Sequence, residues 1–305
     1  LNGGKYGCKI TNIANTSYFG RFYPDHFDVV VAPGCNTGGF TYSAQPFTVM
    51  VTAKNGFVPS TITSNYDGST LPNFAQTVTF SDINNVAEGF LSPTIINANA
   101  FSMGVANPIP AFTFNNVATA PIIIKLHAVD TDYVSSSGYE SEATNTIRSG
   151  RIRLLNAYGS EILDLPMTMR AEYWQNATNG WQTNTADTCT DATLSFSAIL
   201  PTDITSNTCV LDTGSSSGNS SKGCSITASS NKQYAEAGVN DFTGNFNLWL
   251  KAPGSGNSGS LVVTAMVPPW LRYNWTGLKA NPKGLASFGV SKSDSSKIVH
   301  RQERY

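Results

Sequence analysis

The sequence predicts an all-β protein built from two tandem immunoglobulin-like β-sandwich domains. Three observations support this fold class. Short stretches rich in Val, Ile, Thr and aromatic residues alternate between apolar and polar positions, as half-buried strands do. Gly, Pro, Asn and Ser separate these stretches at short intervals. No long window places its apolar residues at the 3.6-residue period of an amphipathic helix.

The N-terminal half of the chain holds the first set of predicted strands. The clearest is 47–53, in which apolar and polar residues alternate before Lys54-Asn55-Gly56, a turn signal. The other strands of this set are 27–32, 77–80 and 122–129. Together they predict a first sandwich over residues 20–134, preceded by an N-terminal arm over residues 1–19.

The C-terminal half holds a second set of predicted strands. It begins at Gly150, where Arg151 and Arg153 alternate with apolar residues. The strands that follow are 166–174, 194–200, 246–250 and 261–266. They predict a second sandwich over residues 150–305, and the polar segment 135–149 predicts a flexible linker between the two.

The two sets open in a similar way. Gly20 precedes a strand led by Pro46, and Gly150 precedes a strand led by Pro166, although the spacings differ, 26 against 16 residues. This pattern is a hint that the two sandwiches are related to each other.

Charged residues are scarce in this chain. Only 13% of the 305 residues are Asp, Glu, Lys or Arg, about half of the ~25% usual for a soluble domain. The net charge of −1 argues against nucleic acid as a partner, because nucleic acid is normally met by a basic surface. Ser, Thr and Asn take the place of charge, as in many secreted β-proteins, so we expect an extracellular or cell-surface protein.

No segment predicts a membrane-spanning helix. The longest charge-free stretch, residues 89–124, is interrupted by Pro93, Pro108 and Pro110, whereas a span needs about 20 mostly apolar residues. The chain opens at Leu1 without an initiator Met or a basic and apolar leader. We interpret it as a processed product or a fragment of a larger protein.

Five cysteines suggest a disulfide framework: Cys8, Cys35, Cys189, Cys209 and Cys224. None forms a Cys-x-x-Cys pair, which disfavours a zinc site, so we prefer structural disulfides formed in an oxidising compartment. Grouping along the sequence favours Cys8–Cys35 and Cys189–Cys209, with Cys209–Cys224 as the competing pair. The odd cysteine is either free or paired outside the chain, and five reduced thiols are the alternative.

Catalytic and metal-binding chemistry finds little support in the sequence. His26, His127 and His300 are the three histidines, and no Gly-x-Ser-x-Gly, His-Glu-x-x-His or phosphate-loop motif is present. We therefore expect no enzyme activity and no cofactor. Asp130 and Asp132 are calcium candidates because carboxylate oxygens suit that ion, although hydrated loop acids are the commoner use of such a pair.

The tryptophans are candidates for ligand contact. All five lie in the second half of the chain. Trp270 and Trp275, in a segment that opens with two prolines, are the two that we expect near the surface, where an aromatic face can stack on a sugar. Packing inside a sandwich is the competing use of the same side chains.

Several sequence blocks recur, in the same order, in a known family. Together they resemble the C-terminal region of the MshQ-like proteins of MSHA (mannose-sensitive haemagglutinin) type IV pilus systems in Gram-negative bacteria. The resemblance covers about residue 20 to the end, although His300 and Gln302 depart from the usual aromatic and basic residues. The blocks are 20–27, 40–47, 150–161, 170–174, 269–272, 286–290 and 298–305.

The resemblance implies a secreted or surface protein that is encoded with pilus genes and exported through the periplasm. In this family, lectin-like modules are sometimes found upstream. The resemblance supplies no catalytic residues.

The favoured hypothesis is a non-enzymatic structural or adhesive module associated with MSHA-like pili or the bacterial cell surface. Its partners are pilus or surface proteins, including a second copy that pairs through sheet edges. One alternative is a carbohydrate-binding module that uses exposed aromatic rings. Another is a self-assembling filament subunit in which the arm, residues 1–19, exchanges a strand with a neighbour.

Overall fold

The structure is a computed structural model whose described regular elements are β-strands apart from two short 3-10 turns, which confirms the all-β class. The predicted arm, Cys8, Cys209, Cys224 and His300 lie outside the described residues. No helix within the described ranges has the length and hydropathy needed to cross a membrane. The described residues are 23–68, 74–138, 142–190, 192–199, 211–212, 244–250, 252, 254–255, 258–275 and 277–289.

The first domain is a sandwich of two sheets. One sheet has the strand order β1-β3-β7 and the other has the order β2-β10-β9-β4-β6, while β5 pairs with β8 in a separate ribbon. A single 3-10 turn, η1 (Ala98–Ala100), is described in this domain. The strands are β1 (His26–Ala32), β2 (Thr41–Tyr42), β3 (Thr48–Lys54), β4 (Val78–Asp82), β5 (Gly89–Ser92), β6 (Ile95–Ile96), β7 (Val105–Ala106), β8 (Ala111–Phe114), β9 (Ile122–Asp130) and β10 (Thr144–Arg148).

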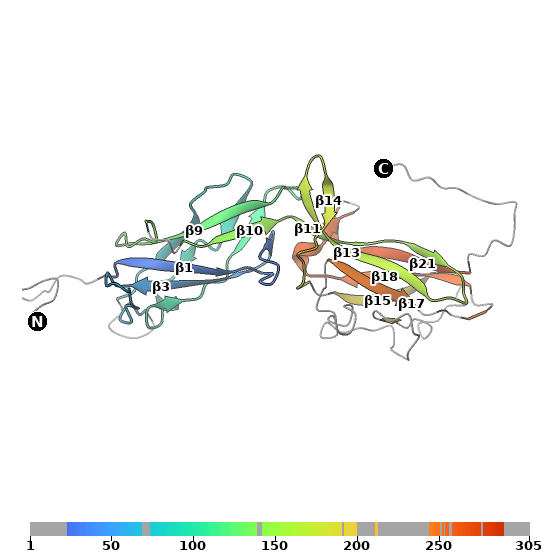
Figure 1. The fold of residues 1–305 in the computed structure, drawn as a ribbon, viewed down its shortest axis with the longest axis horizontal. Coiled ribbons are helices and arrows are strands. Elements are labelled where there is room, and N and C mark those ends of the chain that lie inside the picture. Colours follow the sequence, from blue (N-terminus) through green and yellow to red (C-terminus); the bar gives the residue numbers. More distant parts are fainter. Residues whose placement is uncertain are drawn as a thin grey trace, which may run out of the picture.

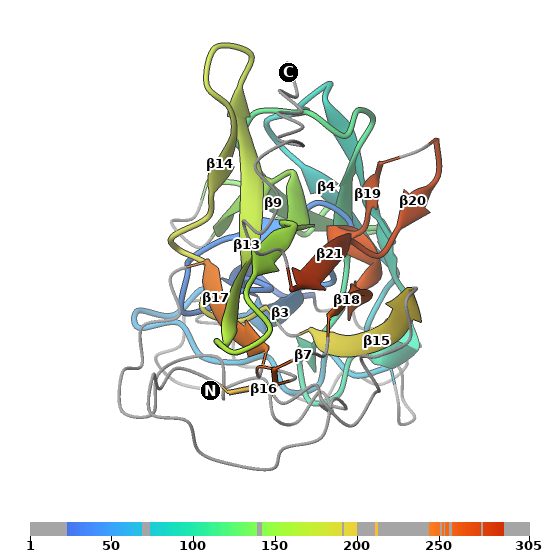
Figure 2. The same cartoon turned by 90° about the vertical axis from the view of Figure 1, so that its right-hand side faces the viewer.

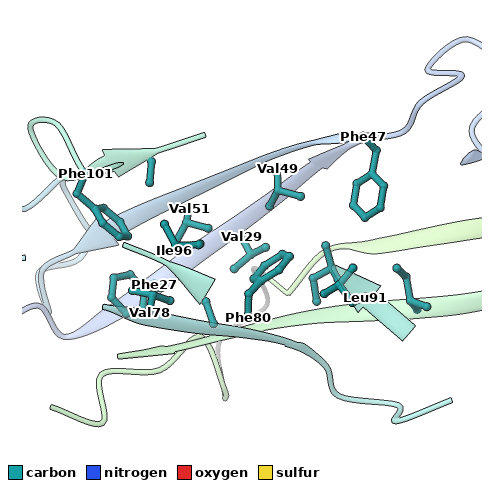
Figure 3. Close-up of a cluster of buried hydrophobic side chains, with 14 of the residues drawn as sticks. Phe27, Val29, Phe47, Val49, Val51, Val78, Phe80, Leu91, Ile96 and Phe101 are labelled. Atoms are coloured by element: carbon teal, nitrogen blue, oxygen red, sulfur yellow. The ribbon is translucent and has the colours of Figure 1, made fainter. Parts of the chain in front are cut away.

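The core of this domain forms where the two sheets face each other. In β9 the buried residues Ile124, Leu126 and Ala128 alternate with more exposed ones, because successive strand side chains point to opposite faces. Figure 3 shows Val49 of β3 and Phe80 of β4 in the same buried cluster. Burying one side chain of this size stabilises a fold by ~1.5–3 kcal/mol, so the packing of many such residues holds the sheets together.

The second domain is also a sandwich of two sheets. One has the order β11-β13-β17-β16, with β14 paired to the end of β13, and the other has the order β12-β21-β18-β15. A 3-10 turn, η4 (Pro269–Leu271), precedes a short hairpin of β19 and β20. The strands are β11 (Gly150–Leu154), β12 (Ala157–Gly159), β13 (Leu165–Asn176), β14 (Gly180–Thr183), β15 (Thr193–Ile199), β16 (Leu211–Asp212), β17 (Asn245–Leu250), β18 (Gly259–Met266), β19 (Tyr273–Asn274), β20 (Lys279–Ala280) and β21 (Lys283–Phe288).

The two domains repeat one topology, which confirms the prediction of two tandem immunoglobulin-like sandwiches. In each, the first strand pairs antiparallel with the third, β1 with β3 and β11 with β13. In each, the second strand crosses to the other sheet and pairs in parallel with the last, β2 with β10 and β12 with β21. The last strand also pairs antiparallel with an earlier strand of the same sheet, β10 with β9 and β21 with β18. On its other side, β9 pairs with β4 and β18 pairs with β15.

The described residues of the segment predicted to be a flexible linker (135–149), namely 135–138 and 142–149, are instead part of the first domain. Its strand β10 pairs with β9 and β2, and Asn145 and Ile147 are buried. The polar composition was misleading because the buried polar groups have partners: Asn145 Nδ2 donates to Thr41 Oγ1 at 2.9 Å. Since β10 ends at Arg148 and β11 begins one residue after Ser149, the two domains follow each other directly, end to end in Figure 1.

Candidate functional site: the joint between the domains

A hairpin of the first domain reaches into the second, and we call it the docking hairpin, residues 33–42. It follows β1 and turns so that Cys35 and Phe40 pair across it. Gly39 supplies the turn with a positive φ of +67°, a conformation that glycine adopts without strain. Cys35, Phe40 and Tyr42 are completely buried and belong to the hydrophobic core of the second domain. The two domains therefore share packing at their contact, which we call the joint.

A disulfide closes the joint covalently. Cys35 of the docking hairpin is bonded to Cys189, which follows β14, across 154 residues of sequence. The predicted pairs Cys8–Cys35 and Cys189–Cys209 are therefore wrong, since each needs a sulfur that is used here. Closeness in the sequence was a poor guide, because pairing depends on Cα separation in the fold, 5.6 Å here. The pair Cys209–Cys224 lies outside the described residues and stays a prediction.

The same place satisfies a geometric test for a metal site but not a chemical one. Ligand atoms of Cys35, Asp187 and Cys189 lie within 4.8 Å of one another. Metal binding by cysteine needs a thiolate, and the disulfide takes both sulfurs out of the ligand set. This grouping is therefore a structural one.

A buried carboxylate, Asp187, lies in the joint. Tyr42 Oη donates to Asp187 Oδ2 at 2.7 Å, and Asn184 Nδ2 donates to Tyr42 Oη at 2.7 Å. The backbone N–H groups of Cys189 and Thr190 donate to Asp187 Oδ1 at 3.1 and 2.9 Å. Burial raises the pKa of Tyr42 well above its ordinary value, and Asp187 adds to the rise. A buried carboxyl group requires such partners, and here they come from both domains.

Arg148, the last residue of β10, also braces the joint. Its guanidinium carbon lies 4.6 Å from the ring centroid of Phe40 and 4.9 Å from that of Tyr173. Arg148 Nη1 donates to Asn184 Oδ1 at 2.6 Å. A cation over an aromatic face is worth about 0.5–2 kcal/mol, with the larger value for desolvated pairs. The joint thus combines a covalent bond, apolar burial, hydrogen bonds and stacking.

A second arginine, Arg151, is enclosed by aromatic rings in the second domain. Its guanidinium carbon lies 4.2, 4.8 and 5.0 Å from the ring centroids of Trp181, Tyr273 and Trp275. Its Nε and Nη2 both lie 2.8 Å from Glu172 Oε2. We call these five residues the Arg151 cluster. It fastens β14 and the β19–β20 hairpin, which project from the sheets in Figure 2, to β11 and β13.

The two tryptophans predicted to stack on sugars have different surroundings. Trp270, in η4, is partly buried and packs against the core of the second domain. Trp275 belongs to the Arg151 cluster and is 40% exposed. Packing therefore accounts for Trp270, and Trp275 is the exposed ring of the two. Glycan binding stays a prediction.

The calcium candidates shape the turn after β9. Asp130 is buried, and its Oδ1 accepts from the backbone N–H groups of Asp132 and Val134 at 2.8 and 2.9 Å. Its Oδ2 accepts from Tyr66 Oη at 2.8 Å. Burial raises the pKa of Asp130, although these hydrogen bonds oppose the rise. The carboxylate has a structural use here, and calcium binding stays a prediction.

One polar cluster of the first domain was missed by the sequence analysis, and we call it the Glu142 cluster. Glu142 Oε1 lies 2.6 Å from His127 Nδ1, and Oε2 lies 3.0 Å from Lys125 Nζ. Ser136 Oγ donates to Glu142 Oε1 at 3.1 Å and lies 3.2 Å from the same His127 nitrogen. In a serine hydrolase the carboxylate and the hydroxyl use opposite ring nitrogens. Here both lie at Nδ1, an arrangement that does not activate a nucleophile.

Two sequence profiles together match almost the whole chain. The profile of DUF6701, third domain, matches residues 4–149, and that of DUF6701, fourth domain, matches residues 148–304. The chain belongs to the DUF6701 family. The two DUF6701 profiles meet where β10 passes into β11, at the joint. No curated protein matches the sequence, and the finer link of these DUF6701 domains to MshQ-like proteins stays a prediction.

Three solved structures that are similar to the two DUF6701 domains are distant from them. The adhesin InvE of Yersinia pseudotuberculosis is 14% identical with a TM-score of 0.25, and the match covers 86% of this chain and 58% of that one. The titin fragment I67–I69 is 7% identical with a TM-score of 0.26, covering 81% and 60%. The surface-layer protein SbsC, domains 4–9, is 10% identical with a TM-score of 0.20, covering 85% and 31%. Likenesses this weak carry no argument about function.

Proposed function

We propose that the third and fourth DUF6701 domains form a non-enzymatic structural or adhesive section of a larger bacterial surface protein. The joint is the observation that carries the proposal. Domains that only need to be connected are usually joined by a flexible linker with a small, polar interface. Here a disulfide, a shared core and a buried carboxylate hold one domain against the next. Such a joint suits a stiff rod that transmits load or holds an adhesive end away from the cell.

The location that we propose is extracellular, reached through the periplasm. The Cys35–Cys189 disulfide supports it, because disulfides persist in oxidising compartments and are rare in the cytosol. The sparse charge, 13% of residues, supports it as well. The resemblance to MshQ-like proteins extends the proposal to MSHA-like pili, with pilus or surface proteins as partners.

The proposal includes the absence of enzyme activity and of a cofactor. Its support is the way in which the polar groups are used. Asp187 and Asp130 accept hydrogen bonds from groups of the protein itself, and the Glu142 cluster places Ser136 and the carboxylate at one histidine nitrogen. Each of these arrangements stabilises the fold.

Carbohydrate binding is a second candidate, and the exposed ring of Trp275 is the observation that favours it. We would measure binding to a glycan array for the wild type and for Trp275→Ala, with Trp270→Phe as a control in the core. Loss of binding in Trp275→Ala alone supports the candidate. The filament alternative depends on the arm, residues 1–19, which lies outside the described residues; electron microscopy of an arm deletion tests it.

Surface fractionation of the native bacterium tests the main proposal. We expect antibody to the chain to label intact cells or sheared surface fibres. We also expect non-reducing peptide mapping of that material to recover Cys35 linked to Cys189. A protein that stays in the cytoplasm with both cysteines reduced would contradict the proposal. A surface protein that is absent from the pilus fraction would contradict only its extension to pili.

A further inference from the structure

We propose that an exposed apolar tip on the first domain is the docking surface for the domain that precedes it in the family. The apolar tip consists of Phe57, Val58, Ile62 and Met103, which are 71%, 100%, 47% and 67% exposed. A single exposed apolar residue is ordinary. A group of them at one end of a domain is typical of an interaction site.

The loop that carries the tip is held in one shape by its own hydrogen bonds. Lys54 and Ile62 pair across its base. Asn55 Oδ1 accepts from the backbone N–H groups of Phe57 and Thr61 at 3.2 and 3.0 Å, and Asn55 Nδ2 donates to Thr61 Oγ1 at 2.6 Å. Phe57 therefore needs little further ordering of its backbone to bind a partner, which lowers the entropic cost of docking.

The second part of the tip lies beside this loop. Met103 belongs to the turn before β7, and a Cβ on the adjacent Gly104 would lie 2.8 Å from Ile62 Cγ2. The Met103 backbone N–H donates to Asp67 Oδ2 at 2.7 Å, which fixes the turn. The four apolar residues thus come from two neighbouring, anchored turns.

The tip lies at the end of the first domain where the chain enters it. β1 and β3 are antiparallel, so the loop after β3 lies at the opposite end from the docking hairpin, which follows β1 (Figure 1). The backbone N–H of Asp25 donates to the carbonyl of Lys54 at 2.8 Å, and a Cβ on Gly56 would lie 3.0 Å from Asp25 Oδ1. A domain upstream is covalently connected to this end of the first domain, which raises its effective concentration near the tip.

The repeated fold identifies the occupant. In the fourth domain, β13 is followed by β14 and then by the segment 184–190, which receives the docking hairpin of the third domain. In the third domain the equivalent strand is β3, and the apolar tip follows it directly. The profile that matches this domain is the third DUF6701 domain. In the family, the second DUF6701 domain precedes it. By this equivalence, the apolar tip receives a hairpin of the second DUF6701 domain, the one that precedes this chain's first domain.

The chemistry of this second joint differs from the first. Residues 55–77 contain no cysteine, so this loop offers no sulfur for a disulfide to the preceding domain. The contact is expected to be apolar, formed with a hairpin that presents aliphatic or aromatic side chains. This inference rests on the proposed function as part of a longer surface rod.

Hydroxyl-radical footprinting tests the inference, because phenylalanine and methionine report their own solvent access. The 305-residue chain is compared with the natural longer protein that includes the preceding DUF6701 domain. We expect oxidation of Phe57 and Met103 to fall severalfold in the longer protein. Met266, 46% exposed in the fourth domain, is the internal control and should not change.

Paired variants of the longer protein give the second measurement. Phe57→Ser with Val58→Ser should increase protease cleavage between the second and third DUF6701 domains. Ile162→Ser with Leu163→Ser, an adjacent apolar pair in the fourth domain that is 60% and 67% exposed, is the control and should not. Equal oxidation of Phe57 in the two proteins would overturn the inference. So would protection that appears in the 305-residue chain with rising concentration, or on adding glycans or phospholipid vesicles.

The outcomes separate this inference from the proposed function. If Phe57 stays reactive in a protein that is displayed on the cell surface, only the docking surface is wrong. If the protein is not on the surface but Phe57 is protected, the proposed function is wrong and the domain contact stands.

Discussion

The joint and the Glu142 cluster are each built around a buried carboxylate, but the groups that hydrogen-bond to the carboxylate differ. In the joint, the groups described as donating to Asp187 are neutral, including the Tyr42 hydroxyl and the backbone N–H of Thr190. In the Glu142 cluster, the partners are Lys125, His127 and the hydroxyl of Ser136. The joint links two domains and is reinforced by a disulfide. The Glu142 cluster stabilises a single domain and does so through charged groups.

This difference predicts different responses to the surroundings. Apolar burial and a covalent bond depend little on salt or on pH near neutrality, whereas an ion pair with a partly exposed lysine is screened by salt. The joint therefore depends mainly on interactions whose strength changes little with the salt concentration and pH outside a cell. The Glu142 cluster depends on charged groups, and the lowered pKa of Glu142 makes its contribution sensitive to acid.

Removing Phe40 should give the largest effect. Phe40 lies in the first domain but is 0% exposed in the core of the second, so Phe40→Ala should lower the free energy of unfolding by about 3–5 kcal/mol. Tryptophan fluorescence during urea unfolding follows the second domain, because all five tryptophans lie in that half. The control Phe57→Ala, at a side chain 71% exposed, should change stability by less than ~0.5 kcal/mol. Equal effects would show that the docking hairpin is not part of the second core.

Opening the disulfide should give the next largest effect. Replacing Cys35 and Cys189 together by serine frees a loop that spans 154 residues, and we expect a loss of about 2–4 kcal/mol. Small-angle scattering should show a wider range of angles between two folded domains. Thr37→Ala with Thr188→Ala removes a hydroxyl contact across the same joint and serves as the non-covalent control. Unchanged scattering in the serine variant would mean that burial alone sets the angle.

Tyr42→Phe isolates the hydrogen bond to Asp187 from the packing of the ring. The variant leaves a buried carboxylate with one donor fewer, so we expect a loss of about 1–2 kcal/mol in chemical denaturation. Tyr158→Phe, at a residue 60% exposed, is the matched control and should be close to neutral. A neutral Tyr42→Phe would show that the backbone donors satisfy Asp187 without help from the first domain.

The fold class was predictable because it depends on local patterns. Alternation in segments such as 47–53 and 122–129 marks strands regardless of their partners, and both segments correspond to strands, β3 and β9. The linker was mispredicted over 135–149 because a polar strand and a polar loop look alike in sequence. What distinguishes them is the hydrogen bond between Asn145 and Thr41, residues 104 positions apart.

The joint itself was not predictable, because its members meet only in the folded chain. Cys35 pairs with Cys189 and Tyr42 with Asp187, and no sequence spacing marks either contact. The Glu142 cluster was missed for the same reason. Its visible signal was the placement of Lys125 and His127 two residues apart in one strand, but Glu142 fell within the supposed linker.

The smallest effect should be the acid sensitivity that the Glu142 cluster gives to the first domain. Burial alone raises the pKa of Glu142, but hydrogen bonds from His127, Lys125 and Ser136 outweigh it, so the pKa lies below its ordinary value. A carboxyl group with a lowered folded-state pKa binds fewer protons folded than unfolded in acid. Its stabilising contribution is complete above the unfolded value of about 4.3 and is lost as the pH falls through the lower folded value.

Glu142→Gln should therefore make the free energy of unfolding less dependent on pH in the acid range, while leaving the joint intact. We expect a loss of about 1 kcal/mol near neutral pH, shrinking as the pH falls below about 4 because the wild type loses the same contribution there. Glu88→Gln, at an exposed position of the same domain, is the control and should follow the wild-type curve. Denaturant unfolding measured in steps from pH 3 to 7 makes the comparison. A deficit that persists unchanged at the acid end would mean that Glu142 stabilises the fold by packing, and the contrast between the two carboxylates would be one of position only.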